Sequence, residues 1–134
     1  MKKLIINTDG AARGNPGPAG IGVVIKDEKG AVVREIAEYI GETTNNQAEY
    51  RALIMALEAA VELKADSVGI FADSELMVSQ IKGIYKVKNE GLKPLFDQAR
   101  ELLQKFKVCN IEYLPREKNK EADKLANIAI DKHR

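Results

Sequence analysis

Several residue types that mark particular classes of protein are scarce or absent in this sequence of 134 residues. It has no tryptophan, and aromatic residues make up only 5% of it. The single cysteine, Cys109, excludes an intramolecular disulfide and any zinc site built on cysteines. The single histidine, His133, lies next to the C-terminus, where we expect a frayed surface position. Neither a zinc protein nor a disulfide-stabilised secreted domain is therefore expected.

Long apolar runs are also missing. No stretch approaches the roughly 20 apolar residues that a membrane-spanning helix needs. The first residues look like the start of an export signal, but their apolar part ends at Asn7 and is too short for one. We therefore expect a cytoplasmic protein in a reducing compartment, with no membrane partner.

Positive and negative charges nearly balance, since 21 basic and 20 acidic residues give a net charge of +1. This balance does not indicate a nucleic-acid binder. Lysines are nevertheless concentrated between Lys82 and Lys93, where four lysines stand against one glutamate. A basic face and an ordinary solvated surface are both consistent with this distribution. The composition, 45% hydrophobic and 31% charged, predicts a single globular domain over residues 1–134, which we expect to be a monomer.

Hydrophobic periodicity and turn residues predict a mixture of strands and helices. The pattern predicts strands at residues 4–8, 21–25, 31–40, 67–72 and 108–114, and helices at 48–63, 74–81, 92–106 and 119–133. Five glycines and two prolines between Gly10 and Gly22 predict a loop there. An initial hairpin followed by strand–helix alternation predicts an α/β fold with a mixed sheet that is covered by helices.

Four of the twenty acidic residues stand out because their neighbours are apolar. Asp9 and Asp73 each follow a short apolar strand. Glu49 lies in the first turn of its predicted helix, on the apolar face. Asp123 lies at the edge of the apolar stripe of the last helix. A carboxylate in such surroundings is costly unless it is paired or bound to a cation.

Two interpretations of these acids follow from the residues alone. Ligands gather at the carboxyl ends of parallel strands, so Asp9 and Asp73 would converge if their strands are parallel neighbours. Each acid could equally be an unrelated cap or turn residue, because aspartate favours both positions. If the acids share a site, oxygen donors without cysteine or a nearby histidine suit Mg²⁺ or Mn²⁺ rather than zinc. Two such ions ~4 Å apart can promote phosphodiester cleavage.

The segments around the four acids form a recognisable set. They are INTDGAARGNPGP at residues 6–18, TNNQAEY at 44–50, FADS at 71–74 and NKEADKLA at 119–126. Together they resemble the type 1 ribonuclease H family: they occur in the family's order and span nearly the whole chain. Any one of them alone would be weak, whereas all four together are specific. The resemblance implies the ribonuclease H-like fold, a five-stranded mixed sheet with an antiparallel hairpin and parallel strands, flanked by helices.

The resemblance also implies an activity, the hydrolysis of the RNA strand of an RNA/DNA hybrid to 5′-phosphate and 3′-hydroxyl ends. The enzyme would use two Mg²⁺ ions, for which Mn²⁺ can substitute. The four acids would be its catalytic residues and metal ligands: Asp9, Glu49, Asp73 and Asp123.

Four further residues match family positions that bind the substrate: Asn15, Thr44, Asn45 and Asn46. The asparagines would contact the minor groove and the ribose 2′-hydroxyls, and the threonine would contact a phosphate of the DNA strand. Amide side chains both donate and accept hydrogen bonds, which suits a 2′-hydroxyl, the group that distinguishes RNA from DNA. Turn and capping chemistry is the alternative explanation of these residues.

The sequence departs from the family pattern in two places. Many members have a histidine in the loop before the last acidic helix, whereas residues 114–119 contain none, and Arg116 or Glu117 could take part instead. Between Asp73 and Leu92 the chain also lacks room for the basic, tryptophan-rich protrusion of some bacterial members. We therefore expect a short form with modest substrate affinity that falls as salt rises.

Rival functions remain open on the sequence. The fold could serve as a catalytically weak hybrid-binding domain, although all four acids are present. It could also be a related carboxylate nuclease, such as a junction resolvase or integrase core, or one with a broader range that includes double-stranded RNA. The asparagine pair at residues 45–46 argues against the resolvase and integrase cores, because they do not need to read ribose.

Overall fold

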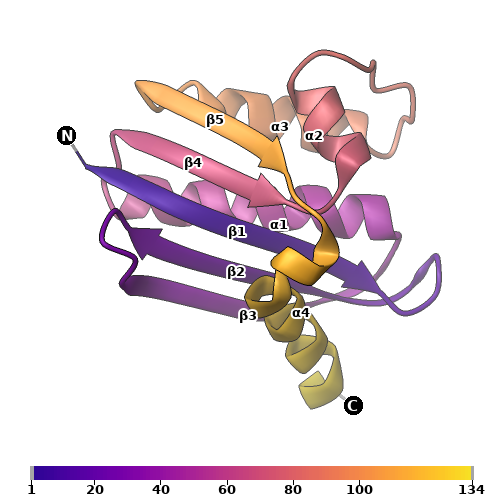
Figure 1. Ribbon diagram of the computed structural model, residues 1–134. Coiled ribbons are helices and arrows are strands. Elements are labelled where there is room, and N and C mark those ends of the chain that lie inside the picture. The colour runs from indigo at the N-terminus through magenta and orange to yellow at the C-terminus, as the bar shows by residue number, and fades with distance from the viewer. Residues whose placement is uncertain (1, 134) are drawn as a thin grey trace.

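The computed structural model describes residues 2–133 and contains one five-stranded sheet with the strand order β3-β2-β1-β4-β5 (Figure 1). The strands are β1 (Lys3–Ala12), β2 (Gly17–Asp27), β3 (Val32–Thr43), β4 (Ser67–Ala72) and β5 (Val108–Tyr113). The first three strands are antiparallel, and β1, β4 and β5 are parallel neighbours. The predicted mixed sheet, a hairpin followed by parallel strands, is therefore confirmed.

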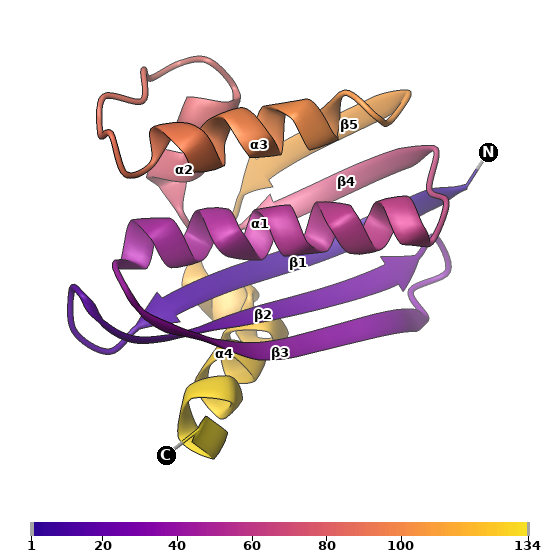
Figure 2. The same cartoon turned by 180° about the vertical axis from the view of Figure 1, so that it is seen from behind.

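Helices cover both faces of this sheet. They are α1 (Asn45–Glu62), α2 (Glu75–Ile81), α3 (Lys93–Leu103) and α4 (Lys120–His133), and a short 3₁₀ helix, η1 (Arg116–Lys118), precedes the last. Figures 1 and 2 show α1 and α3 on one face and α4 on the opposite face. None of the helices within residues 2–133 is long and apolar enough to cross a membrane.

The main core lies between the sheet and α1. The inward residues of β1 and α1 that are almost inaccessible to solvent include Leu4, Ile6, Leu53 and Leu57. The outward residues of β1, Ile5 and Asn7, are half-buried, so the first strand is fully buried only on the face toward α1. This half-covered face is the one from which polar residues of β1 reach the start of α4.

The predicted loop at residues 10–22 is wrong, because β1 continues to Ala12 and β2 begins at Gly17. Three of the five glycines, Gly10, Gly20 and Gly22, lie where helices approach the sheet closely. A Cβ on Gly22 would lie 1.9 Å from the carbonyl oxygen of Ala122 in α4. A Cβ on Gly10 would lie 2.2 Å from the carbonyl oxygen of Ala48 in α1. Glycine in a strand marks such an approach as well as a turn, and composition alone does not separate the two.

The C-terminal end of α4 is better held than the sequence suggested. The helix extends to His133, whose exposed ring stacks on Tyr39 of β3 with ring centroids 3.6 Å apart and an interplanar angle of 8°. Asp131, in the same helix, forms an ion pair with Arg13 at 2.6 Å. The expectation of a surface position for His133 is confirmed, and that of fraying is wrong.

Candidate metal centre

Two neighbouring parallel strands bring the first two acids together. The register of β1 and β4 pairs Thr8 with Ala72, so Asp9 and Asp73 occupy the next position of the two adjacent strands. Asp73 directly follows β4 as expected, whereas Asp9 lies inside β1, which continues to Ala12. In Figure 1 the ends of β4 and β5 point toward the start of α4, which lies against this edge of the sheet. The convergence that the sequence made conditional on parallel pairing is thus present.

Helix α1 supplies the third acid. Thr44 caps this helix, since its hydroxyl accepts a hydrogen bond from the backbone N–H of Gln47 at 3.2 Å. Glu49 then lies one turn into the helix and is 7% exposed. Its Oε1 accepts a hydrogen bond from the backbone N–H of Gly10 at 3.0 Å. Glycine at position 10 allows the contact, because a side chain there would collide with α1.

The three carboxylates form one cluster. One ligand oxygen from each of Asp9, Glu49 and Asp73 lies within 4.8 Å of the others. Asp9 is fully buried, and neither of its oxygens has a hydrogen-bond partner among the described residues; the same holds for Oδ1 of Asp73. Buried oxygens without partners are costly, and a bound cation would compensate them. The donor set of oxygens alone fits Mg²⁺ or Mn²⁺.

The electrostatics of the cluster lead to the same conclusion. Burial, followed by the neighbouring charges of Glu49 and Asp73, raises the pKa of Asp9 to about 10. Burial and the charge of Asp73 also hold the pKa of Glu49 well above its usual range. Without a cation, these acids therefore keep protons at neutral pH that a divalent ion would displace.

The fourth predicted acid comes from α4. Asp123 is half-buried, and its side chain is close enough to Asp9 to contribute to the raised pKa of Asp9, after burial and the charges of Glu49 and Asp73. Asn127, one turn further along α4, donates to the carbonyl oxygen of Asp123 at 3.0 Å and to its Oδ1 at 3.4 Å. Asp123 thus lies beside the three acids but is not part of the group whose ligand oxygens all lie within 4.8 Å of one another.

The four predicted substrate residues lie together at the start of α1. Asn15 accepts a hydrogen bond from the backbone N–H of Asn45 at 3.1 Å, and Asn45 in turn accepts one from the backbone N–H of Ala12 at 2.8 Å. These bonds hold the loop at residues 13–16 against the helix start. Asn45 and Asn46 are exposed, and Thr44 is half-buried. Thr44 therefore caps the helix, and Asn15 and Asn45 hold the loop in place. The exposed Asn45 and Asn46 still form a polar surface at the start of α1.

Arg116 and Glu117 lie in η1, on the connection between β5 and α4, and both are exposed. Arg116 is near enough to the cluster for its positive charge to lower the pKa of Glu49, against the larger effect of burial. The structure therefore places the positively charged side chain of Arg116 near the acids, on the connection where the family pattern has a histidine.

Sequence reasoning missed one part of the site, a pair of asparagines beside Asp73. Asn119 precedes α4 and is 2% exposed, and its side chain donates to Oδ2 of Asp73 at 3.2 Å. Asn7 of β1 donates to Asn119 at 3.0 Å. Asn119 belongs to a segment that carried the resemblance, but an asparagine before a helix is normally read as a cap.

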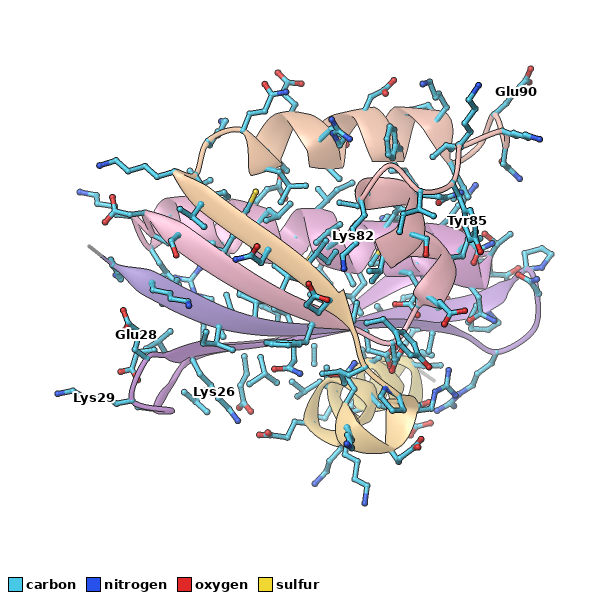
Figure 3. The ribbon with its side chains drawn as sticks, turned by 45° about the horizontal axis from the view of Figure 1, so that its top comes forward. Lys26, Glu28, Lys29, Lys82, Tyr85 and Glu90 are labelled. Atoms are coloured by element: carbon cyan, nitrogen blue, oxygen red, sulfur yellow. The ribbon has the colours of Figure 1, made fainter. Side chains whose placement is uncertain are left out.

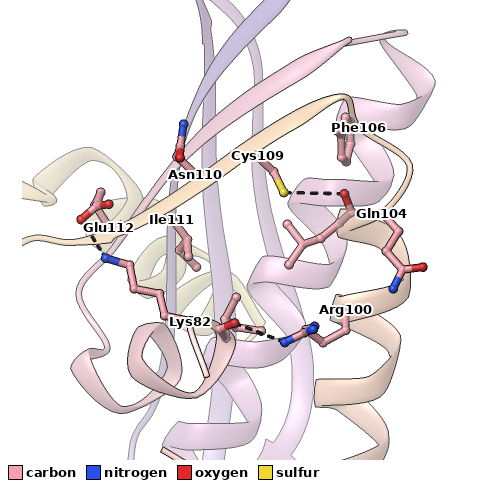
Figure 4. Close-up of a pocket in the computed structure, with 10 residues that line it drawn as sticks. Lys82, Arg100, Gln104, Phe106, Cys109, Asn110, Ile111 and Glu112 are labelled. Atoms are coloured by element: carbon pink, nitrogen blue, oxygen red, sulfur yellow. Dashed lines mark hydrogen bonds and ion pairs between the residues drawn. The ribbon is translucent and has the colours of Figure 1, made fainter. Parts of the chain in front are cut away.

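A hollow in the described surface lies elsewhere. It has a volume of about 560 Å³ and lies between α2, α3 and the edge strand β5 (Figure 4). Its lining includes Leu103 and Ile111, together with Lys82 and Glu112, which form an ion pair at 3.0 Å. None of the predicted site residues lines it. The carboxylate cluster lies outside this hollow, between β1, α1 and the end of β4.

Comparison with known proteins gives one family match. A family model described as reverse transcriptase-like matches residues 7–129. Ribonuclease HI of Halobacterium salinarum is 46% identical over 123 residues, which cover 92% of this chain and 62% of that protein. The bifunctional protein Rv2228c of Mycobacterium tuberculosis is 45% identical over 130 residues, which cover 96% of this chain and 36% of that protein. The chain thus spans only part of the length of these relatives.

Solved structures extend the similarity to three dimensions. The chain is 51% identical to LC11-RNase H1, whose crystal structure is a complex with an RNA/DNA hybrid. That match covers 97% of this chain and 98% of the other, with a TM-score of 0.91. The crystal structure of RNase H1 from Halobacterium salinarum matches with a TM-score of 0.94 at 43% identity, over 97% of this chain and 98% of that one.

Proposed function

Since this chain belongs to the type 1 ribonuclease H family, we propose that it is an endonuclease that hydrolyses the RNA strand of RNA/DNA hybrids. The observation that carries the proposal is the cluster of Asp9, Glu49 and Asp73, with three buried oxygens that lack a partner among the described residues. The relative that was crystallised with an RNA/DNA hybrid supports the choice of substrate.

The four acids would hold the metal ions. Asp9, Glu49 and Asp73 would hold them from β1, α1 and the end of β4, and Asp123 would complete the set from α4. When bound, two Mg²⁺ ions would activate a water and stabilise the leaving oxygen, which predicts 5′-phosphate and 3′-hydroxyl products. The residues themselves orient the ligand oxygens and exclude water from Asp9, which no solvent reaches.

The polar surface at the start of α1 would bind the hybrid beside the acids. Asn15, Asn45 and Asn46 would read the minor groove and the ribose 2′-hydroxyls, because amides both donate and accept. Thr44 would lie near a phosphate of the DNA strand, at the positive end of the α1 dipole. The hydrogen bonds that tie Asn15 to Asn45 support a preorganised contact surface.

Arg116 would take the place of the loop histidine. An arginine does not exchange protons near neutral pH, so its contribution would be positive charge near the phosphate rather than proton transfer. Glu117, on the same turn of η1, offers a carboxylate that could accept a proton. We therefore expect Arg116→Ala to slow cleavage and Arg116→Lys to restore part of the rate.

The loop between α2 and α3 would provide a second, weaker contact with the substrate. Tyr85 is 55% exposed and lies among the exposed Lys82, Lys86 and Lys88. Figure 3 shows Tyr85 and Glu90 on this loop, far from the β2–β3 turn that carries Lys29. An exposed aromatic ring among lysines suits a nucleic-acid backbone and its bases.

We expect the chain to act as a monomer in the cytoplasm. Size-exclusion chromatography would check the expected monomer.

The proposal is tested with a panel of labelled duplexes. RNA/DNA, RNA/RNA and DNA/DNA duplexes of one sequence are incubated with the protein in Mg²⁺, in Mn²⁺ and in EDTA. We expect cleavage of only the RNA strand of the hybrid, and only with metal. Equal cleavage of RNA/RNA would indicate the broader carboxylate nuclease, and binding of the hybrid without any cleavage would indicate a hybrid-binding domain.

A further inference from the structure

Asn7, Asn119 and Asp73 form a chain of hydrogen bonds that leads from the half-covered face of the sheet into the acid cluster. Nδ2 of Asn7 donates to Oδ1 of Asn119 at 3.0 Å. Nδ2 of Asn119 donates to the carbonyl oxygen of Thr8 at 2.9 Å and to Oδ2 of Asp73 at 3.2 Å. The Asn119 side chain is therefore engaged at both ends, and its residue is 98% buried (2% exposed).

The direction of these bonds determines which way the Asn119 amide faces. A backbone carbonyl and a carboxylate can only accept, so the NH₂ group of Asn119 must face Thr8 and Asp73. Asn7 reinforces this orientation, because its own NH₂ group requires an acceptor and finds Oδ1 of Asn119. Reversing the amide would place an oxygen against two acceptors and an NH₂ group against a donor.

The same bonds separate the two oxygens of Asp73. Oδ2 is occupied by Asn119, whereas Oδ1 is buried without a partner among the described residues. A carboxylate held at one oxygen cannot rotate freely, so its other oxygen stays in one position. Oδ1 is thus the oxygen that remains available to a cation shared with Asp9 and Glu49.

We propose that Asn7 is a positioning residue that acts through Asn119 to hold Asp73 in the orientation that binds metal. The inference rests on the proposed metal centre. Partners of metal ligands typically contribute a factor of about 10–100 to metal affinity, because they fix the ligand's orientation and its protonation. Asn119 would also join β1 to the start of α4, but that structural role alone predicts a change in stability without a change in metal affinity.

The substitution Asn7→Asp tests the proposal most sharply. An aspartate has nearly the same shape but only accepts, so at residue 7 it would set an oxygen against Oδ1 of Asn119 and remove the hydrogen bond that holds the Asn119 amide in place. The added negative charge would by itself strengthen cation binding. The proposal predicts the opposite sign, a Mg²⁺ affinity that is about 10–100-fold weaker.

Mg²⁺ binding to the metal-free protein is measured by calorimetry, with Mn²⁺ binding followed by electron paramagnetic resonance as a second readout. Thermal unfolding in EDTA shows whether each variant folds. Asn7→Ala removes the donor without adding charge and decides the question if Asn7→Asp does not fold. Asn110→Asp makes the same change at an exposed position of β5 and should not weaken binding.

Weaker metal binding by both Asn7 variants, with Asn110→Asp unaffected, would support the positioning role. Wild-type affinity in a folded Asn7→Ala, or tighter binding by Asn7→Asp, would overturn it while leaving the metal centre intact. Failure of the wild-type chain itself to bind either ion would instead refute the metal centre, and with it this inference.

Discussion

Asp9 is the residue whose position is hardest to explain without a ligand. It is fully buried, both of its oxygens lack partners among the described residues, and Glu49 and Asp73 are beside it. Its apolar flanks made it a candidate from sequence, because a carboxylate after an apolar strand is unusual. The lack of partners could not be predicted, since it depends on the way in which β4 and α1 meet the end of β1.

The metal-free protein should therefore lose stability as pH rises. The pKa of Asp9 is about 10 in the folded chain against an ordinary value of 3.8, so between these values the folded state binds the extra proton. The free energy of unfolding should fall with increasing pH, by at most about 1.4 kcal/mol per pH unit for one proton. Glu49, whose pKa is also raised, acts in the same direction. Thermal unfolding in EDTA from pH 5 to pH 9 measures this slope.

Asp9→Asn should weaken that pH dependence and raise the metal-free melting temperature, because a neutral amide replaces a carboxyl that must take up a proton when the chain folds at neutral pH. At this chain length 1 kcal/mol corresponds to roughly 3–5 °C. The same change at the exposed Asp97 should have little effect. A metal-free Asp9→Asn protein that is less stable than wild type would show that the Asp9 carboxylate is satisfied in a way that the structure does not contain.

At the level of elements, the order of strands and helices could be predicted from the sequence. The end of β1 and the start of β2 could not, because the glycines there suggested a loop. Capping chemistry could be expected at Thr44, and its hydroxyl accepts a hydrogen bond from the backbone N–H three residues later. Ser74, predicted as the first residue of its helix, is in fact the cap of α2. Gly10, Gly20 and Gly22 instead belong to strands that helices touch. A contact between a strand and a helix about a hundred residues away, such as that of Gly22 with Ala122, leaves no local signal in the sequence.

Gly22→Ala should separate α4 from the sheet. Its Cβ would lie 1.9 Å from the carbonyl oxygen of Ala122, and backbone must move to make room. We expect a loss of about 1–3 kcal/mol in unfolding free energy and reduced cleavage, because α4 carries Asp123. Chemical denaturation and cleavage rates on one preparation would measure both.

Gly69→Ala is the matched control for this prediction. A Cβ on Gly69, in β4, would meet only Cδ1 of Ile5 at 3.6 Å, an ordinary contact. Its stability should stay within about 0.5 kcal/mol of wild type. Equal losses in the two variants would mean that any alanine in this sheet is harmful, and the close approach of α4 would then explain nothing.

At the scale of the whole molecule, the net charge of +1 concealed a local arrangement. Lys82, Lys86 and Lys88 lie on the loop after α2, and Lys93 begins α3. The three acids of the cluster lie elsewhere, between β1, α1 and the end of β4, where they are buried or half-buried. A charge total could not reveal this separation. The four acids could be predicted because each belongs to a sequence segment, while the role of Asn7 could not, since its partner is 112 residues away.

Hybrid affinity should depend on the loop lysines and on salt. Lys86→Ala and Lys88→Ala should each weaken binding and reduce the slope of log affinity against log salt by about 1, because each removes a phosphate contact. Lys29→Ala, at the β2–β3 turn, should change neither. Binding is measured in Ca²⁺ or EDTA at several salt concentrations. Identical slopes for all three variants would place the hybrid on another face.

The central claim, that the carboxylate cluster is the metal centre of a hybrid-specific ribonuclease, is tested most directly by one assay. The RNA strand of an RNA/DNA hybrid is followed with and without Mg²⁺, for the wild-type chain and for Asp9→Asn. We predict cleavage by the wild type only with Mg²⁺, and a loss of at least about a thousandfold in Asp9→Asn although it still binds the hybrid. Cleavage by Asp9→Asn at the wild-type rate, or by the wild type in EDTA, would contradict the account.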